Sequence, residues 1–109
     1  MHELAIGKSI LRLAVDRATA AGRTRVTAID LVVGELRNLE DPTLQRYFDH
    51  ISAGSIAEGA VLRVTRAPAR FTCATCGEPS PAIVCGPCGG APCTLVGGRE
   101  MLVERLEVA

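Results

Sequence analysis

Residues 73–89, "CATCGEPSPAIVCGPCG", decide how the cysteine-rich part of this chain folds. The stretch holds two Cys-x-x-Cys pairs, each followed by glycine, with eight residues between them. A short Cys-x-x-Cys loop lets two thiolates reach one ion, and the glycine permits a tight backbone whose N–H groups donate to sulfur. Four thiolates in a closed tetrahedron suit structural Zn²⁺, whereas catalytic zinc keeps an open position. We therefore predict that one zinc ion is bound by Cys73, Cys76, Cys85 and Cys88.

The tetrapeptide "CGPC" at residues 85–88 also occurs in the active site of thioredoxins, so a thiol-redox enzyme is an alternative. There the motif follows a buried strand and opens a helix, which lowers the pKa of the first thiol. Here "GGAPC" follows, which cannot begin a helix, and a second pair lies just upstream, so metal binding is favoured. The fifth cysteine, Cys93, is interpreted as a free or partly buried thiol, with ligand exchange with Cys88 as the alternative.

The segment around the cysteines is predicted to be an insertion. Residues 73–98 are rich in Gly, Pro and Cys and lack periodicity, so they need a staple in place of an apolar core. "APARFT" (67–72) is predicted to be an extended connector, and "EMLVERLEV" (100–108) a strand that returns to the main sheet. We expect a zinc-binding domain at 70–98 and a second domain made of 1–69 and 99–109.

The N-terminal part predicts two amphipathic helices. The first spans residues 3 to about 20 and ends near Gly22, with Leu4, Leu11, Val15 and Ala18 widening its apolar stripe. The second begins with Asp41 as N-cap and Pro42 at the first helical position. The residues predicted to face the core are Ile6, Ile10, Leu13 and Ala14 in the first helix, and Leu44, Tyr47, Phe48 and Ile51 in the second.

Two further strands complete the predicted fold. "RVTAIDLVVGEL" (25–36) alternates, with Thr27, Ile29, Leu31 and Val33 on one face, and "AVLRVTR" (60–66) follows a turn bracketed by Gly54 and Gly59. The fold class is therefore α+β: about three strands and two helices, plus a small zinc-knuckle domain of zinc-ribbon or rubredoxin type before the last strand.

Composition narrows the function. With 12 basic and 12 acidic residues the formal net charge is zero, which argues against non-specific nucleic-acid binding because that requires a basic face. No signal peptide or membrane-spanning run is visible, so we expect a cytoplasmic protein without a membrane role, with cysteines kept reduced. No nucleophile–histidine–acid grouping stands out, so we expect no enzyme.

The first residues, "MHELA", have two interpretations. A frayed polar end is one, with Glu3 complementing the positive end of the helix dipole. The other is a chelate: we expect Met1 to be retained before a residue as large as histidine. The Met1 amine, the His2 amide and the His2 imidazole then form the planar nitrogen set that Ni²⁺ or Cu²⁺ prefers, with Glu3 as a further donor.

In order along the chain, "MHEL", "RVTAIDLVVGEL", "LQRYFDHISAGSIAEGAVLRVTRAPARFTC" and the two cysteine pairs resemble the HypA/HybF family of hydrogenase nickel-incorporation proteins. The resemblance covers nearly the whole chain. It implies a nickel metallochaperone that delivers Ni(II) to the [NiFe]-hydrogenase large subunit with the GTPase HypB, or in some members serves urease maturation. It also implies nickel at His2, Met1 and Glu3, and structural Zn(II) at the four cysteines, in a monomer or homodimer.

The chain departs from the family pattern at three places. "GEPSPAIV" between the cysteine pairs is short for the family, Cys93 is extra, and Ala5 stands where serine is common. His50, beside the apolar stripe of the second helix, is interpreted as an ordinary helix residue. The rival function is a zinc-ribbon module that binds nucleic acid or a transcription complex, although three aromatic residues offer no stacking platform.

Overall fold

The computed structural model describes residues 2–86, 88–90 and 93–109, and for His2 the backbone alone. It divides into two compact units, each described here by itself. The first holds the residues up to Val32 together with Leu39–Thr65 and Leu102–Ala109. The second holds Val33–Asn38 and Arg66–Met101. No helix in the described part of the chain is long and apolar enough to span a membrane.

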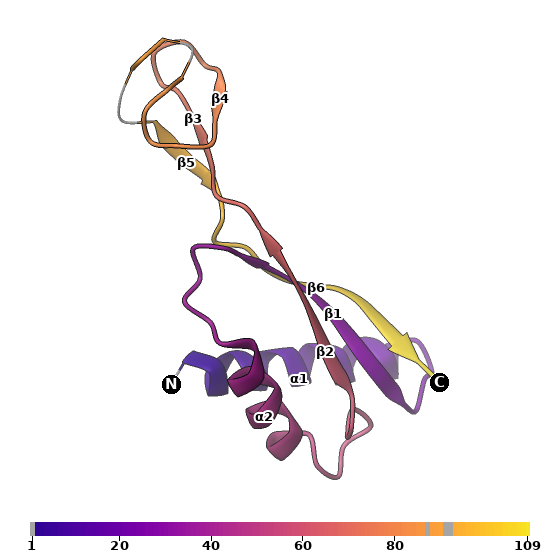
Figure 1. The fold of residues 1–109 in the computed structure, drawn as a ribbon. Coiled ribbons are helices and arrows are strands. Elements are labelled where there is room, and N and C mark those ends of the chain that lie inside the picture. The colour runs from indigo at the N-terminus through magenta and orange to yellow at the C-terminus, as the bar shows by residue number, and fades with distance from the viewer. Residues whose placement is uncertain (1, 87, 91–92) are drawn as a thin grey trace. The chain divides into compact units, whose positions relative to one another are not determined.

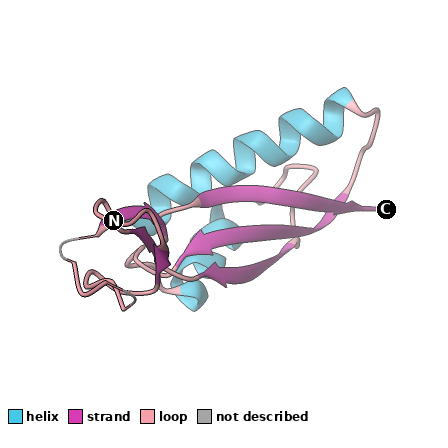
Figure 2. Ribbon diagram, turned by 90° about the horizontal axis from the view of Figure 1, so that it is seen from above, coloured by secondary structure: helices cyan, strands magenta, loops and turns pink. Residues whose placement is uncertain are grey.

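Helix α1 (His2–Ala20) runs alongside the strands of the first unit and packs on α2 (Figure 2). Gly22 follows it with φ 72°, the left-handed backbone that ends many helices, as predicted. The buried stripe is Gly7, Ile10, Ala14 and Ala18. Leu13, predicted to be buried, is 37% exposed, because at about 100° per residue it lies at the margin of the stripe formed by residues 7, 10, 14 and 18.

Helix α2 (Asp41–Ile51) begins one residue earlier than expected. Glu40 is the N-cap, with extended φ −95° and ψ 113°, so the prediction of Asp41 as N-cap is wrong; Asp41 is the first helical residue. Leu44 and Phe48 are buried as predicted, whereas Tyr47 is 38% exposed. A tyrosine at the rim buries part of its ring while its hydroxyl reaches water.

Three strands form the main sheet, in the order β2-β1-β6, as the fold prediction required. In Figure 1, β1 (Val26–Gly34) and β2 (Val61–Ala67) run in the same direction with α2 between them in sequence, a helical crossover of the kind that parallel strands need. β6 (Met101–Val108) runs the opposite way beside β1, where the Ala109 N–H donates to the Arg25 carbonyl. The last strand therefore returns to the main sheet, as predicted.

The core of the first unit is formed mainly by β1 and the two helices. Ile29 and Leu31 are buried on the predicted face, as is Val33 where the strand enters the second unit, but Val26 and Ala28 are buried too. The central strand is covered more fully than simple alternation implies, because strands flank it on both edges.

The second unit contains a small sheet that the sequence did not predict. β3 (Arg70–Thr72) lies within the expected connector and pairs antiparallel with β4 (Pro79–Ser80) and with β5 (Thr94–Gly97). These strands are two to four residues long, too short for a periodic signal. Their buried cluster consists of Cys73, Cys85 and Cys93, with Phe71 packed against it.

Candidate metal centre

The two cysteine pairs fold into the same turn. The Gly77 N–H donates to the Cys73 carbonyl and the Gly89 N–H to the Cys85 carbonyl, both at 2.8 Å. Gly77 has φ 77° and Gly89 φ 70°, a conformation that side chains other than glycine rarely adopt. The glycine after each pair is thus required by the backbone, as the sequence indicated.

The turns bring four sulfur atoms together. The sulfurs of Cys73 and Cys88 are 3.5 Å apart, and those of Cys76 and Cys85 are 3.6 Å apart. All four lie within 4.8 Å of one another. A tetrahedral ion with metal–sulfur bonds of about 2.3 Å holds its sulfurs about 3.8 Å apart. The four predicted zinc ligands therefore form a group of the size that one such ion requires.

The four thiols differ in exposure. Cys73 and Cys85, the first cysteine of each pair, are buried, whereas Cys76 and Cys88 are exposed. The Gly90 N–H, just after the second pair, donates to the Cys88 sulfur at 3.4 Å. The group is thus half embedded in the second unit and half open to solvent.

The local environment shifts the pKa values of Cys73 and Cys85 in opposite directions. The N–H groups of Cys76 and Thr75 donate to the Cys73 sulfur and lower the pKa of that thiol to about 6. The Cys88 N–H donates to the Cys85 sulfur, but burial and the neighbouring thiols outweigh it and raise the pKa of Cys85 to about 12. Four ionised sulfurs this close repel one another, and a bound cation removes that repulsion. The donor set fits a thiophilic divalent ion.

Cys93 lies beside this group without belonging to it. Its side chain is 7% exposed and packs in the same cluster as Cys73 and Cys85. Burial, followed by the charge of Cys73, raises the pKa of the Cys93 thiol. The described residues that could hold one ion together are the other four cysteines. Cys93 therefore contributes to packing beside the sulfur group.

The structure shows only part of the predicted nickel site. Met1 lies outside the described residues, and of His2 only the backbone at the start of α1 is described. Glu3 Oε2 accepts a hydrogen bond of 3.3 Å from the Glu40 N–H, at the N-cap of α2. Its own N–H and that of Glu40 lower the pKa of Glu3. Thirty-six residues separate this pair in sequence, and no local signal could have predicted the contact.

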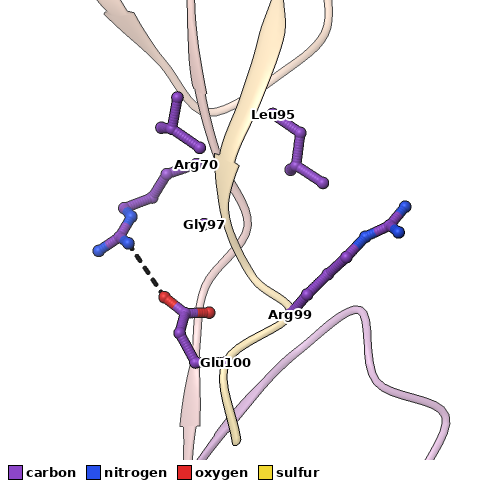
Figure 3. Close-up of a pocket in the computed structure, with 6 residues that line it drawn as sticks. Arg70, Leu95, Gly97, Arg99 and Glu100 are labelled. Atoms are coloured by element: carbon purple, nitrogen blue, oxygen red, sulfur yellow. Dashed lines mark hydrogen bonds and ion pairs between the residues drawn. The ribbon is translucent and has the colours of Figure 1, made fainter.

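A shallow cavity of about 420 Å³ lies elsewhere in the second unit (Figure 3). Arg70 donates to Glu100 at 3.0 Å, and its guanidinium lies over Gly97, where an added Cβ would be 2.2 Å from Nη2. Arg99 extends on the other side of the chain in Figure 3. Such a lining offers guanidinium donors and no metal ligands except Glu100. No sequence pattern indicated this cavity. Its lining residues are Arg70, Leu95, Val96, Gly97, Arg99 and Glu100.

The fold and the sulfur group define a small α+β protein that carries a four-cysteine metal site. The family described as "Hydrogenase/urease nickel incorporation, metallochaperone, hypA" matches residues 1–108, and this chain belongs to that family. The hydrogenase maturation factor HypA of Dehalococcoides mccartyi strain CBDB1 is 36% identical over 112 residues, covering 99% of this chain and 94% of that protein. The corresponding factor of Chlorobaculum tepidum is 34% identical, covering 99% of both chains.

Two solved structures share the fold. The solution structure of the Ni metallochaperone HypA from Helicobacter pylori has a TM-score of 0.73 and 18% identity, covering 97% of this chain and 96% of that one. A second structure, titled a solution structure of HypA protein, has a TM-score of 0.79 and 19% identity, covering 100% and 97%. The resemblance noted in the sequence is confirmed. The family is described as one of metallochaperones for the incorporation of nickel into hydrogenase or urease.

Proposed function

We propose that this chain binds Ni(II) at its first three residues and delivers it for [NiFe]-hydrogenase maturation. The observation that carries the proposal is the family match over residues 1–108, which includes the Met-His-Glu start and both cysteine pairs. Nickel is the cargo in this proposal, and the zinc ion is a resident structural metal.

The proposed nickel ligands are the Met1 amine, the His2 amide and imidazole, and Glu3. The three nitrogens form fused chelate rings in one plane, a geometry that Ni²⁺ favours and from which Zn²⁺ gains nothing. A cation at a helix N-terminus opposes the helix dipole, which weakens binding and eases release. The carboxylate of Glu3, held by the Glu40 N–H, would offset part of the ion's charge.

The proposed zinc ligands are the four clustered cysteines. Their sulfur separations support this assignment, as does the burial of Cys73 and Cys85 in the cluster of the second unit. Zinc bound there would stabilise the second unit and hold the segment between β3 and β5 in place.

The proposed partners are the GTPase HypB and the hydrogenase large subunit, with urease maturation proteins as a further possibility. Transfer would proceed by ligand exchange: nickel leaves a few exposed donors for a site that offers more. A cytoplasmic location and a monomeric or homodimeric state accompany this proposal.

A nickel titration of four proteins tests the nickel site. They are the native chain, His2→Ala, a chain with two residues added before Met1, and His50→Ala as a control on the exposed end of α2. The chelate predicts at least about tenfold weaker binding in the first two variants, because each removes a ring-forming nitrogen. His50→Ala should bind as the native chain does. Equal affinity in all four would rule out the proposed site.

A further inference from the structure

One edge of the main sheet is closed by a side chain. β2 is an outer strand of the sheet, so one of its edges faces no other strand in the described part of the chain. Gln45, from α2, covers the start of this edge. The Leu62 N–H donates to Gln45 Oε1 at 2.8 Å, and Gln45 Nε2 donates to the Ala60 carbonyl at 3.2 Å. The amide thus satisfies two edge groups that an added strand would otherwise pair with.

These two hydrogen bonds have the pattern of a parallel strand pair. In a parallel pair, a residue of one strand donates to the carbonyl before its opposite residue and accepts from the N–H after it. Gln45 contacts the groups on either side of Val61 in this way. The side-chain amide therefore imitates one residue of a parallel strand lying opposite Val61.

A cavity whose rim carries two carboxylates, called here the acidic rim, adjoins this edge, and the Arg25 guanidinium lies close to Gly59, another of its lining residues. It measures about 590 Å³ and is lined by Gln45, Asp49, Glu58, Gly59, Ala60 and Val61, all in the first unit. The side chain of Val61 is 53% exposed. Asp49 accepts from Gln45 Nε2 at 2.7 Å and Glu58 from the Gly54 N–H at 3.1 Å. Within the described ranges, neither carboxylate forms an ion pair with arginine or lysine.

We infer that the β2 edge is a docking site for an extended, basic segment of a partner protein, with Gln45 as a displaceable placeholder. The segment adds as a parallel strand beside Val61, and its backbone takes over the bonds to Ala60 and Leu62. Apolar side chains cover the exposed Val61. Lysine or arginine side chains pair with Asp49 and Glu58, which also compensates Asp49 for the loss of the Gln45 donor.

In this proposal the Gln45 amide limits indiscriminate strand pairing at the edge. An incoming strand replaces hydrogen bonds that already exist, so backbone pairing at this point gains little, and the acidic rim decides which segment binds. Removing the amide should strengthen binding of a basic segment. Removing the carboxylates should weaken it and reduce its salt dependence.

The test uses the full chain and a labelled hexapeptide of alternating lysine and valine, with binding followed by fluorescence anisotropy. Gln45→Ala should bind roughly three- to tenfold tighter than the native chain, because a competing hydrogen-bonded group is gone. Asp49→Asn with Glu58→Gln should bind several-fold more weakly. The matched control Asp16→Asn, an exposed acid on α1, should change nothing. A peptide with glutamate in place of lysine should not bind.

Nuclear magnetic resonance of the native chain supplies a measurement that needs no variant. Peptide binding should shift the side-chain amide signal of Gln45 and slow hydrogen exchange at Leu62 and Val64. An unshifted Gln45 signal overturns the proposal, and so does binding unchanged by the loss of both carboxylates. If Gln45→Ala dimerises without peptide, the occupant is a second copy of the chain, and the partner proposal is wrong.

Discussion

The sulfur of Cys73, the first ligand-type residue of one cysteine pair, lies 3.5 Å from that of Cys88, the last of the other pair. Cys76 and Cys85 form the second contact across the two pairs, at 3.6 Å. These two contacts run between the pairs and join them into one group. Loss of one cysteine should affect the whole group.

Substitution of any one of the four cysteines should abolish stoichiometric zinc binding. Cys73→Ser leaves three thiolates and an open position, and the affinity of a structural site falls when its tetrahedron is incomplete. The matched control is Cys93→Ser, which keeps the four clustered sulfurs. The zinc content of the two purified variants is measured and compared with that of the native chain. Full zinc occupancy in Cys73→Ser, or loss of zinc in Cys93→Ser, would contradict the assignment.

Removal of the metal by a chelator should unfold the second unit and spare the first. The buried cluster of the second unit consists of three cysteines with Phe71 beside it, which is too little apolar surface to hold the fold without an ion. The first unit keeps its own core, including Ile29, Leu31 and Phe48. Nuclear magnetic resonance spectra of the backbone amides, taken before and after chelation, show which of the two units has unfolded. Loss of native signals from α1 and β1 would show that the units do not unfold separately.

Two glycines should respond to alanine in opposite ways. At Gly34 an added Cβ would lie 2.1 Å from the backbone of Gly98, which cannot move aside, so Gly34→Ala should destabilise the chain by about 3 kcal/mol. At Gly7, inside α1, the nearest atom is Ile51 Cδ1 at 3.4 Å, the end of a flexible side chain. Gly7→Ala should therefore stabilise by about 0.5–1 kcal/mol through helix propensity. Urea unfolding of the zinc-loaded proteins measures both changes.

Asp30 should make stability depend on pH at the acid end. Hydrogen bonds from Arg63, at 2.6 Å, and from Arg105, at 3.0 Å, lower the pKa of this carboxyl on the central strand. A lowered pKa in the folded state means that Asp30 stabilises the fold above its ordinary pKa, and that this contribution disappears as the pH falls through the lowered value.

Asp30→Asn tests this dependence. The variant should be less stable than the native chain at pH 6, and the difference should shrink as the pH is lowered toward 3. The exposed residue Asp16 provides the control, Asp16→Asn, whose difference from the native chain should be small at every pH. Urea unfolding followed by far-ultraviolet circular dichroism measures the free energies. A difference that stays constant with pH would show that the Asp30 charge is not involved.

The sequence by itself determined the four-cysteine group, the two helices, the long strands and the return of the last strand. These features depend on patterns that are local in sequence: Cys-x-x-Cys spacing, glycines that permit left-handed backbone, and apolar periodicity over many residues. The family resemblance was readable for the same reason, because its motifs are short and ordered along the chain. Even so, the local patterns misplaced the N-cap of α2 by one residue and assigned Leu13 and Tyr47 to the core.

Only the tertiary structure decided which residues meet across long stretches of chain. The small sheet of β3, β4 and β5 has strands too short to show a period, and contacts between distant residues stabilise it. The bond from Glu40 to Glu3 joins the starts of two helices, and Gln45 covers the edge of β2 because α2 packs beside that strand. Such pairings depend on how elements pack together, which no single segment encodes.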